Sequence, residues 1–224
     1  MAARLSVIIP VLNEAACIRQ ALEALAPLRA RGHEVIVVDG GSDDATRELA
    51  APRCDRLLMV ERGRARQMNA GARVAAGEAL VFLHADTCLP KDADRLILAA
   101  LERAWWGHFD VAIESERRLL KLVACAMNLR SRVTGIATGD QAIFVRREAF
   151  AGFPEIALME DVALSRLMKR RGRPACLRER VRTSARRWEA RGVLRTILLM
   201  WRLRLLYALG RAPERLAREY ADKR

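Results

Sequence analysis

The sequence has few of the residues that stabilise small secreted folds or bind zinc. Its five cysteines are scattered, odd in number and free of C-x-x-C spacing: Cys17, Cys54, Cys88, Cys125 and Cys176. Such cysteines are typical of buried, reduced thiols in a cytosolic protein rather than of a disulfide framework. The three histidines, His33, His84 and His108, form neither H-x-x-x-H nor H-E-x-x-H, which argues against a catalytic zinc site.

Several diagnostic motifs are also absent. The chain has no G-x-G-x-x-G, no G-x-x-x-x-G-K-[ST] and no G-x-S-x-G, which argues against dinucleotide binding, P-loop chemistry and a hydrolase elbow. The apolar run near the N-terminus, within "MAARLSVIIPVLNE", is too short for a signal peptide. Residues 192–210 form a longer apolar stretch, but Arg195, Arg202 and Arg204 interrupt it, so it fails the test for a spanning helix.

Acidic residues are scarce in the last quarter of the chain. Residues 164–224 hold 19 basic and 5 acidic residues, whereas residues 1–163 hold 21 and 22. A basic segment suits anionic lipid, phosphorylated ligands or nucleic acid, and an Arg-rich solvated surface is the simpler alternative. Nucleic-acid binding would require aromatic residues among the bases. This segment has leucine runs instead, so we expect no nucleic-acid partner.

The pattern along the chain predicts an α/β fold. Apolar strands at 5–12, 34–41, 55–61 and 78–86 alternate with helical spacings, as in a mostly parallel sheet with helices on both faces. After residue 104 the alternation fails; strands are expected at 107–115 and 141–147, with a helical or mobile insertion between them. We expect one domain over residues 1–190 and a basic, apolar helical extension over residues 191–224.

Two predicted central strands end in an acid at the same edge of the sheet, where ligands of such folds collect. Asp39 is followed by the Gly40-Gly41 turn, whose backbone N–H groups can face a ligand. Asp86, in "LHADT", offers a carboxylate suited to Mg²⁺ or Mn²⁺. The alternative is that each acid only caps the following helix.

Three further segments carry candidate groups, each with a structural alternative. In "RGRARQMNAGA", arginines including Arg66 precede a helix that contains Asn69, and could neutralise a phosphate; a solvated basic turn is the alternative. Glu160 and Asp161 begin a helix, where mutual repulsion can raise one pKa for proton transfer, or where both simply favour the helix dipole. Arg187 and Trp188 could grip a diphosphate and a sugar or lipid, or Trp188 could pack in the core.

Taken together, these segments resemble the family-2 glycosyltransferases of the GT-A fold, specifically the small bacterial members. The matching order is "VIIPVLNE", "VVDGGSDDAT", "RARQMNAGA", "LHADT", "GDQAIFVRR", "LMEDVALSRLMKRRG" and "SARRWE", over about residues 4–190. The set is specific, although each member alone is weak.

The resemblance implies roles for individual residues. Asp39 would hydrogen-bond the base or ribose of a nucleotide, Asp86 would bind the cation at the diphosphate, and Asp161 would be the catalytic base beside Glu160. The residues expected to contact the nucleotide sugar are Pro10, Asn13, Glu14, Asp39, Gly41, Arg66, Asn69, Asp86, Arg187 and Trp188.

The resemblance implies inverting, non-processive transfer from a UDP- or GDP-linked sugar to an acceptor hydroxyl, with Mg²⁺ or Mn²⁺ held by Asp86 and His84. His84 replaces the first acid of the D-x-D motif, and Ser184 replaces the Gln of processive enzymes. A sugar-nucleotide binding protein without catalysis and a nucleotidyltransferase on a related fold are the alternatives. We expect a cytoplasmic enzyme in which residues 192–210 meet the inner face of the membrane and a lipid acceptor, or pack on the core or on a second subunit.

Overall fold

A computed structural model describes residues 4–222, and the side chains of Arg187, Arg191, Ala221 and Asp222 lie outside that description. Its eight-stranded mixed sheet has the order β3-β2-β1-β4-β7-β6-β8-β5. The strands are β1 (Leu5–Val11), β2 (Glu34–Asp39), β3 (Arg56–Met59), β4 (Ala79–Phe82), β5 (Thr87–Cys88), β6 (Trp106–Glu114), β7 (Ile143–Arg146) and β8 (Ala175–Ser184). The helices are α1 (Ala15–Ala24), α2 (Ala26–Ala30), α3 (Thr46–Ala50), α4 (Arg64–Val74), α5 (Ala93–Leu101), α6 (Arg118–Thr134), α7 (Glu160–Met168), α8 (Arg186–Arg191), α9 (Val193–Ala208) and α10 (Pro213–Asp222).

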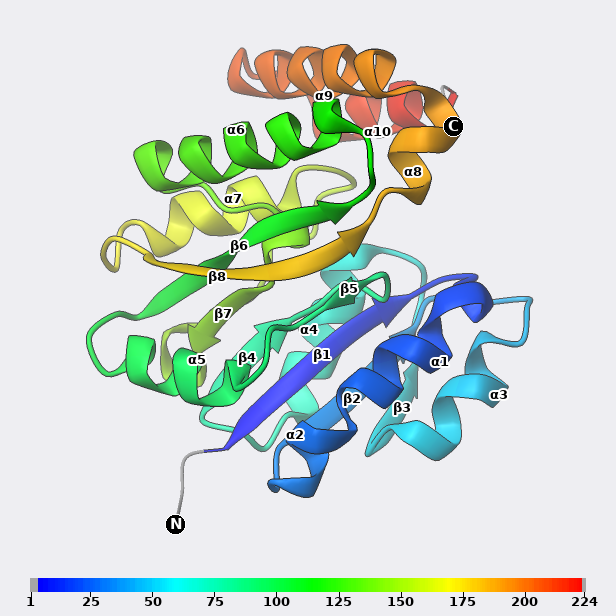
Figure 1. The fold of residues 1–224 in the computed structure, drawn as a ribbon, viewed down its shortest axis with the longest axis vertical. Coiled ribbons are helices and arrows are strands. Elements are labelled where there is room, and N and C mark those ends of the chain that lie inside the picture. Colours follow the sequence, from blue (N-terminus) through cyan, green and yellow to red (C-terminus); the bar gives the residue numbers. More distant parts are fainter. Residues whose placement is uncertain (1–3, 223–224) are drawn as a thin grey trace.

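The parallel half of the sheet forms because its strands are apolar on both faces. β1 pairs in parallel with β2 on one side and with β4 on the other. Leu5, Val7 and Ile9 of β1 enter the core cluster that also holds residues of α1, α2 and α5, whereas Ile8 enters the cluster of α4 and α7. Helices therefore cover both faces of this half, as the sequence predicts (Figure 1).

Helix α4 lies unusually close to the sheet. A Cβ added at Gly71 would stand 2.5 Å from Ile8 Cγ2 and 3.1 Å from Val38 Cγ2, so only glycine fits there. The neighbouring buried residues Ala70 and Ala72 are also small. The "NAGA" stretch thus brings the start of α4 and its side chains close to the carboxyl ends of β1 and β2.

The second half of the sheet is partly antiparallel. β7 pairs antiparallel with β4 and β6, and β8 runs parallel to β6. The predicted insertion between β6 and β7 is the helix α6 (Figure 1). The sequence patterns did not predict β8 or the separate helix α10. Arginines and a glutamate interrupt the apolar pattern of β8, and the turn at Gly210 interrupts the C-terminal helical region.

The C-terminal helices lie across the top of the molecule in Figure 1, where α9 runs beside α6 and α10. Leu199 and Leu203 of α9 are buried in one cluster with Met159, Val162 and Leu216, so one face of α9 does pack on the protein. Arg202 of α9 forms an ion pair with Glu219 of α10 at 3.1 Å. Within residues 4–222 no helix is both long and apolar enough to cross a membrane.

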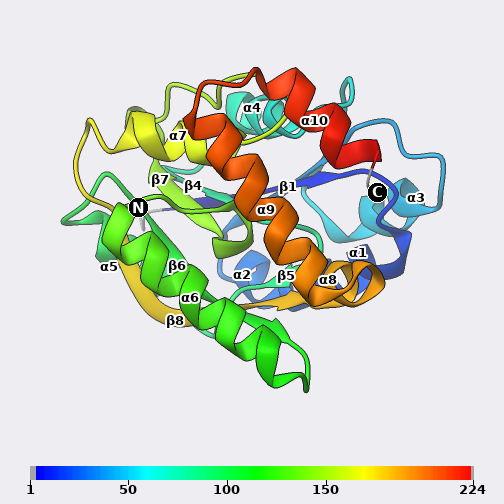
Figure 2. The ribbon, with the colours of Figure 1, turned by 90° about the horizontal axis from the view of Figure 1, so that it is seen from above.

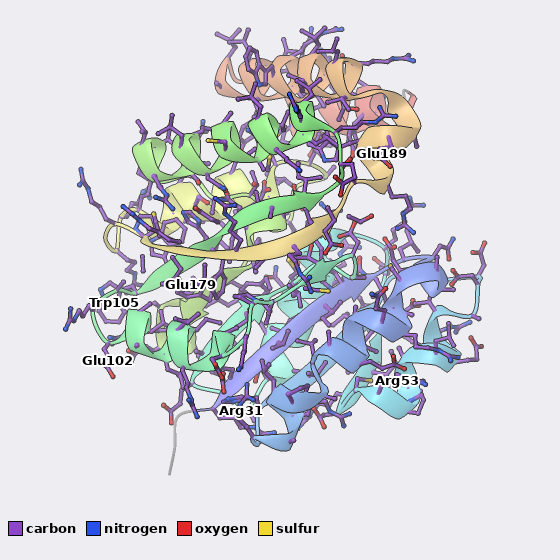
Figure 3. The ribbon with its side chains drawn as sticks, viewed as in Figure 1. Arg31, Arg53, Glu102, Trp105, Glu179 and Glu189 are labelled. Carbon is purple, nitrogen blue, oxygen red and sulfur yellow. The ribbon has the colours of Figure 1, made fainter. Side chains whose placement is uncertain are left out.

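The amino-terminal end of the sheet is fixed by buried polar contacts. Asp94 of α5 accepts hydrogen bonds from Arg31 Nε at 2.7 Å, and its carboxylate lies 3.0 Å from His33 Nε2. These contacts lower the pKa of Asp94 to about 2, against the opposing effect of burial. Figure 3 labels Arg31 at the bottom of the view and Glu189 of α8 near the top, so this network lies far from the C-terminal helices.

Candidate active site

A cavity of about 800 Å³ opens at the carboxyl ends of β1, β2 and β4. Its walls come from the loop after β1, the turn after β2, the start of α4, the segment after β4, and the start of α7, and α10 contributes Ala217 and Tyr220. Strand-end loops of a parallel sheet converge there because successive strands point the same way. Among the residues predicted for the nucleotide site, Pro10, Asn13, Glu14, Gly41 and Asp86 line this cavity, and so does His84.

The turn after β2 is held by Asp39. Its buried carboxylate accepts hydrogen bonds from the backbone N–H groups of Gly41 and Ser42, both at 2.9 Å, and from the Ser42 hydroxyl. Gly41 has φ +91°, a conformation that glycine adopts readily. Asp39 is not among the residues that line the cavity, whereas Asp43 is, so the expected contact of Asp39 with a base or ribose stays a prediction.

The loop after β1 is tied to the same turn. The Asn13 N–H donates to Ser42 Oγ at 2.9 Å, and Asn13 Oδ1 accepts from the Asp43 N–H at 3.0 Å. Asn13 has φ +55°, the left-handed region in which asparagine is enriched. Glu14 accepts a hydrogen bond from Arg186 Nη2 at 3.0 Å, which joins this loop to α8. Burial and the Glu14 contact raise the pKa of the Cys17 thiol to about 12, so that thiol stays protonated.

Two residues of the site were missed by the sequence analysis. Gln67 of α4 is buried and donates from Nε2 to the carbonyl groups of Val11 and Val38, both at 2.8 Å. It lines the cavity floor and lies against Gly40, where an added Cβ would meet its side chain at 3.0 Å. Tyr220 also lines the cavity, and no motif distinguished it.

Two predicted binding residues face elsewhere. Arg66 forms ion pairs with Glu61 and, at 3.6 Å, with Glu155. The Asn69 amide exchanges hydrogen bonds with the backbone of Phe153, at 2.9 and 2.7 Å. Neither residue lines the cavity, because helix periodicity turns positions 64 and 67 of α4 toward it and positions 66 and 69 away from it; their expected contact with the nucleotide sugar stays a prediction.

The segment after β4 brings two predicted metal ligands to the rim. Asp86 is half-buried and accepts a weak hydrogen bond from Thr87 Oγ1 at 3.4 Å. His84 Nδ1 lies 3.2 Å from Asp140 Oδ1, and its Nε2 sits where an added Cβ on Gly139 would be only 2.4 Å away. His84 thus packs against Gly139 and faces Asp140 while lining both cavities. The described residues contain no cluster of three or more His, Cys, Asp or Glu suited to a metal ion.

Glu160 and Asp161 begin α7, directly after Met159, which has the left-handed φ of +69°. Asp161 accepts hydrogen bonds from the Gly139 N–H at 2.9 Å and from the Val162 N–H at 2.7 Å. Glu160 lies 3.5 Å from Arg64 Nη1. Burial first, and the charge of Glu160 second, raise the pKa of Asp161 to about 6. An acid with this pKa is ionised at neutral pH yet basic enough to accept a proton.

A smaller cavity of about 140 Å³ adjoins the first one. The two share Arg64, His84, Asp86, Leu158, Glu160 and Tyr220, and the smaller one alone includes Asp161. Ser184, Trp188 and three residues of α9 complete its wall. Trp188 is therefore in the site region, packed against the cluster of Leu120 and Val193. The Arg187 side chain lies outside the described residues, so its predicted role stays a prediction.

Solved structures of other proteins share this fold. A fragment of S. aureus TarS, residues 1–349, superposes with a TM-score of 0.66 at 20% identity, over 81% of this chain and 60% of that one. The mannosyltransferase PcManGT from Pyrobaculum calidifontis, solved with GDP-Man and Mn²⁺, gives a TM-score of 0.60 at 22% identity, over 81% and 57% of the two chains. The order of the sheet and these likenesses give the chain a GT-A fold.

The chain belongs to glycosyl transferase family 2, whose family model matches residues 6–149. Among curated proteins, the PGL/p-HBAD biosynthesis glycosyltransferase of Mycobacterium bovis is 31% identical over 172 residues, which cover 65% of this chain. The match spans 60% of the relative's own length. The family and the GT-A fold expected from the sequence motifs are thus confirmed.

Proposed function

We propose that this glycosyltransferase moves one sugar from a nucleotide-diphosphate sugar to an acceptor hydroxyl, with inversion, and with Asp161 as the general base. The observation that carries the proposal is the position of Asp161. Its carboxylate is partly buried, its pKa is raised to about 6, and it lies in the small cavity that adjoins the larger one at Asp86 and Glu160. A donor in the larger cavity and an acceptor in the smaller one would therefore meet beside this carboxylate.

The larger cavity suits a nucleotide diphosphate. Its volume of about 800 Å³ is in the range of cofactor sites, and Arg62, Arg64 and Arg186 bring positive charge to its wall. Asp43 offers a carboxylate acceptor for the nucleoside end, and Gly41 lines the wall beside it. In support, TarS has been solved with UDP-GlcNAc and PcManGT with GDP-Man. We therefore propose a UDP- or GDP-linked donor.

The residues at the rim fit a divalent cation that is held mainly by the diphosphate. Asp86 supplies one hard oxygen ligand, and Mg²⁺ in such sites keeps several waters and phosphate oxygens. The pairing of His84 Nδ1 with Asp140 favours a role for His84 in positioning that acid, and we propose that Asp86 is the main protein ligand of the cation. When bound, the cation would neutralise charge on the departing diphosphate.

Inversion follows from the proposed role of Asp161. One carboxylate that deprotonates an acceptor hydroxyl is sufficient for single displacement, and no covalent nucleophile is needed. The Gly139 and Val162 N–H groups hold Asp161 in one orientation, so its proton-accepting oxygen would be fixed relative to the acceptor. Single transfer is supported by the small acceptor cavity and by Ser184, which stands where processive enzymes carry Gln.

The test measures the melting temperature of the protein with UDP- and GDP-sugars. Calorimetric titration then measures nucleoside-diphosphate binding with and without Mn²⁺. We expect at least one nucleotide sugar to raise the melting temperature, because a ligand at 100 times its Kd adds roughly 2.7 kcal/mol. Asp86→Ala should abolish the Mn²⁺ dependence of nucleoside-diphosphate binding, whereas His84→Ala should weaken binding less. Equal losses in the two variants would contradict the metal assignment. A protein that binds none of the nucleotides would overturn the proposed function.

A further inference from the structure

The outer face of α9 carries a row of large apolar side chains that no part of the described chain covers. Leu194, Leu198, Trp201, Leu205 and, just past the helix end, Leu209 are 61% to 74% exposed. Their spacing of three and four residues places them on one side of the helix. The opposite side of α9 holds the buried Leu199 and Leu203, so its packing on the protein and its exposed row are separate faces.

Helix α6 carries a second row of the same kind. Leu122, Leu129 and Val133 are 63% to 77% exposed, and Leu119 is also exposed. The inner side of α6 is buried through Leu120 and Ala124. Two amphipathic helices thus turn their packed sides inward and leave apolar rows outside.

The two helices lie side by side. Leu120 and Ala124 of α6 share one buried cluster with Val193 and Ile197 of α9. Figure 1 shows both helices on the same side of the molecule, and Figure 2 shows α9 running between α6 and α10. Side chains stand out from the outer sides of both helices (Figure 3). We call this surface, made by the outer sides of α6 and α9, the α6–α9 face.

The α6–α9 face is also basic. Neither helix contains an Asp or Glu, and together they contain seven bases: Arg118, Lys121, Arg130, Arg132, Arg195, Arg202 and Arg204. Arg118, Lys121 and Arg195 are exposed beside the apolar rows. Arg202 forms an ion pair with Glu219 of α10. Apolar side chains flanked by free bases are the composition of a helix that lies in the interface of an anionic membrane.

We propose that the α6–α9 face docks on an anionic phospholipid bilayer. Its apolar rows enter the interfacial region while the long basic side chains reach the headgroups. A second copy of the chain fits this face poorly. A two-fold contact would set the same acid-free, basic helices against each other and leave their charges unpaired.

The docking surface and the acceptor cavity share one helix. Thr196, Met200 and Arg204 of α9 line the small cavity, on the side of the helix away from its exposed row. The Nε of Arg204 is buried and lacks a hydrogen-bond partner within the described residues. A membrane-bound α9 would therefore bring the acceptor cavity next to the bilayer. This part rests on the proposed function, and it assigns the acceptor to amphiphiles drawn from the membrane.

The test is flotation of the full chain with vesicles of phosphatidylglycerol and phosphatidylcholine, compared with phosphatidylcholine alone. We expect binding to the anionic vesicles that weakens as salt is raised. The double variants Leu198→Glu with Leu205→Glu, and Leu122→Glu with Leu129→Glu, should each reduce the partition coefficient by at least about tenfold. Substitution of Leu206 is avoided, because that residue packs in the cluster of Leu199 and Leu203.

The matched control is Met59→Glu with Leu167→Glu, two exposed apolar residues on other elements. It changes the charge and the apolar surface in the same way, and we expect it to bind vesicles like the unmodified chain. Light scattering without vesicles reports the oligomeric state. A chain that ignores anionic vesicles at low salt would overturn the docking proposal. The docking proposal would also be overturned if the unmodified chain and the control variant were dimers and the α9 double variant were a monomer.

Nucleotide binding separates this proposal from the proposed function. Because the exposed row of α9 is remote from the donor cavity lining, UDP or GDP with Mn²⁺ should stabilise the two face variants as much as the unmodified chain. Lost vesicle binding with intact nucleotide binding supports the α6–α9 face. Absent nucleotide binding with intact vesicle binding would refute the transferase proposal and leave the docking surface standing.

Discussion

At the scale of single residues, Asp161 combines two properties that oppose each other. Its carboxylate must be ionised to accept a proton, but burial and the neighbouring Glu160 disfavour that ionisation. The Gly139 and Val162 N–H groups and the charge of Arg64 limit the pKa to about 6. An ionised Asp161 therefore lowers the stability of the fold at neutral pH. Such a loss of stability is expected where a group is kept for function.

This conflict predicts a pH dependence of stability. The folded protein binds the Asp161 proton up to about pH 6, whereas the unfolded chain releases it near 3.8, so between these values the folded state holds more protons. The contribution of Asp161 to the free energy of unfolding is therefore fully present below pH 3.8. It is lost as the pH rises through 6. Relative to Asp161→Asn, the unfolding free energy of the unmodified chain should fall across this window by at most roughly 3 kcal/mol.

Urea unfolding at a series of pH values measures this difference. The control is Asp44→Asn, since a hydrogen bond from the Thr46 side chain lowers the pKa of Asp44. A lowered pKa gives stability at higher pH that is lost on acidification. The unfolding free energy of the unmodified chain, relative to Asp44→Asn, should therefore rise with pH, opposite to the trend relative to Asp161→Asn. Parallel curves for the unmodified chain and Asp161→Asn would mean that the pKa of Asp161 is not raised.

Single-residue predictions from the sequence succeeded in placing groups at strand ends and were less reliable within a helix and a turn. Asp86 reaches the rim because it follows a strand, and a strand end is readable from apolar alternation. Successive side chains of a helix are turned by about 100° from one another. The sequence does not report which face of α4 points toward the cavity, and Arg66 and Asn69 lie on a face that points away from it. Asp39 turned out to hold its own turn, a role that sequence cannot separate from ligand binding.

At the scale of elements, the close packing of α4 on the sheet decides how the phosphate side of the cavity is built. Gly71→Ala gives α4 a better helix former by about 1 kcal/mol, yet it places a Cβ 2.5 Å from Ile8. Overpacking costs roughly 1 to 3 kcal/mol, so we expect net destabilisation and a weaker nucleotide site, because Arg64 and Gln67 lie on the same helix.

Urea denaturation with and without nucleotide checks the Gly71 prediction. Arg73→Ala, on the exposed side of α4, is the control and should change stability little. A Gly71→Ala variant that is more stable than the unmodified chain would show that helix propensity outweighs the contact with β1 and β2, and that α4 can move away from the sheet.

The elements themselves were predictable in proportion to their burial. β1 and β2 are almost fully buried and mostly apolar, so both strands could be predicted from the sequence. β8 was not predicted because four of its ten residues are charged and its register with β6 shifts between Phe109 and Asp110. Its position depends on the long-range pairing with β6, which no local pattern reports.

At the scale of the whole molecule, the C-terminal helices line both cavities of the proposed active site and build the surface beside them. α10 closes one wall of the donor cavity through Ala217 and Tyr220, and α9 lines the acceptor cavity. Residues on both sides of the boundary expected at residue 190 therefore line each of the two cavities. The sequence predicted the basic, apolar character of this region, but the pairing of its exposed row with that of α6 requires the tertiary structure.

The measurement that tests the central claim most directly is sugar transfer by Asp161→Asn. With a donor that binds, nucleoside-diphosphate release should fall by roughly 10² to 10⁴, because an amide cannot accept the acceptor proton. Donor affinity should stay close to that of the unmodified chain, since Asp161 does not line the donor cavity, and activity of the unmodified chain should rise with an apparent pKa near 6. Near-normal turnover in Asp161→Asn, with donor bound, would contradict the account.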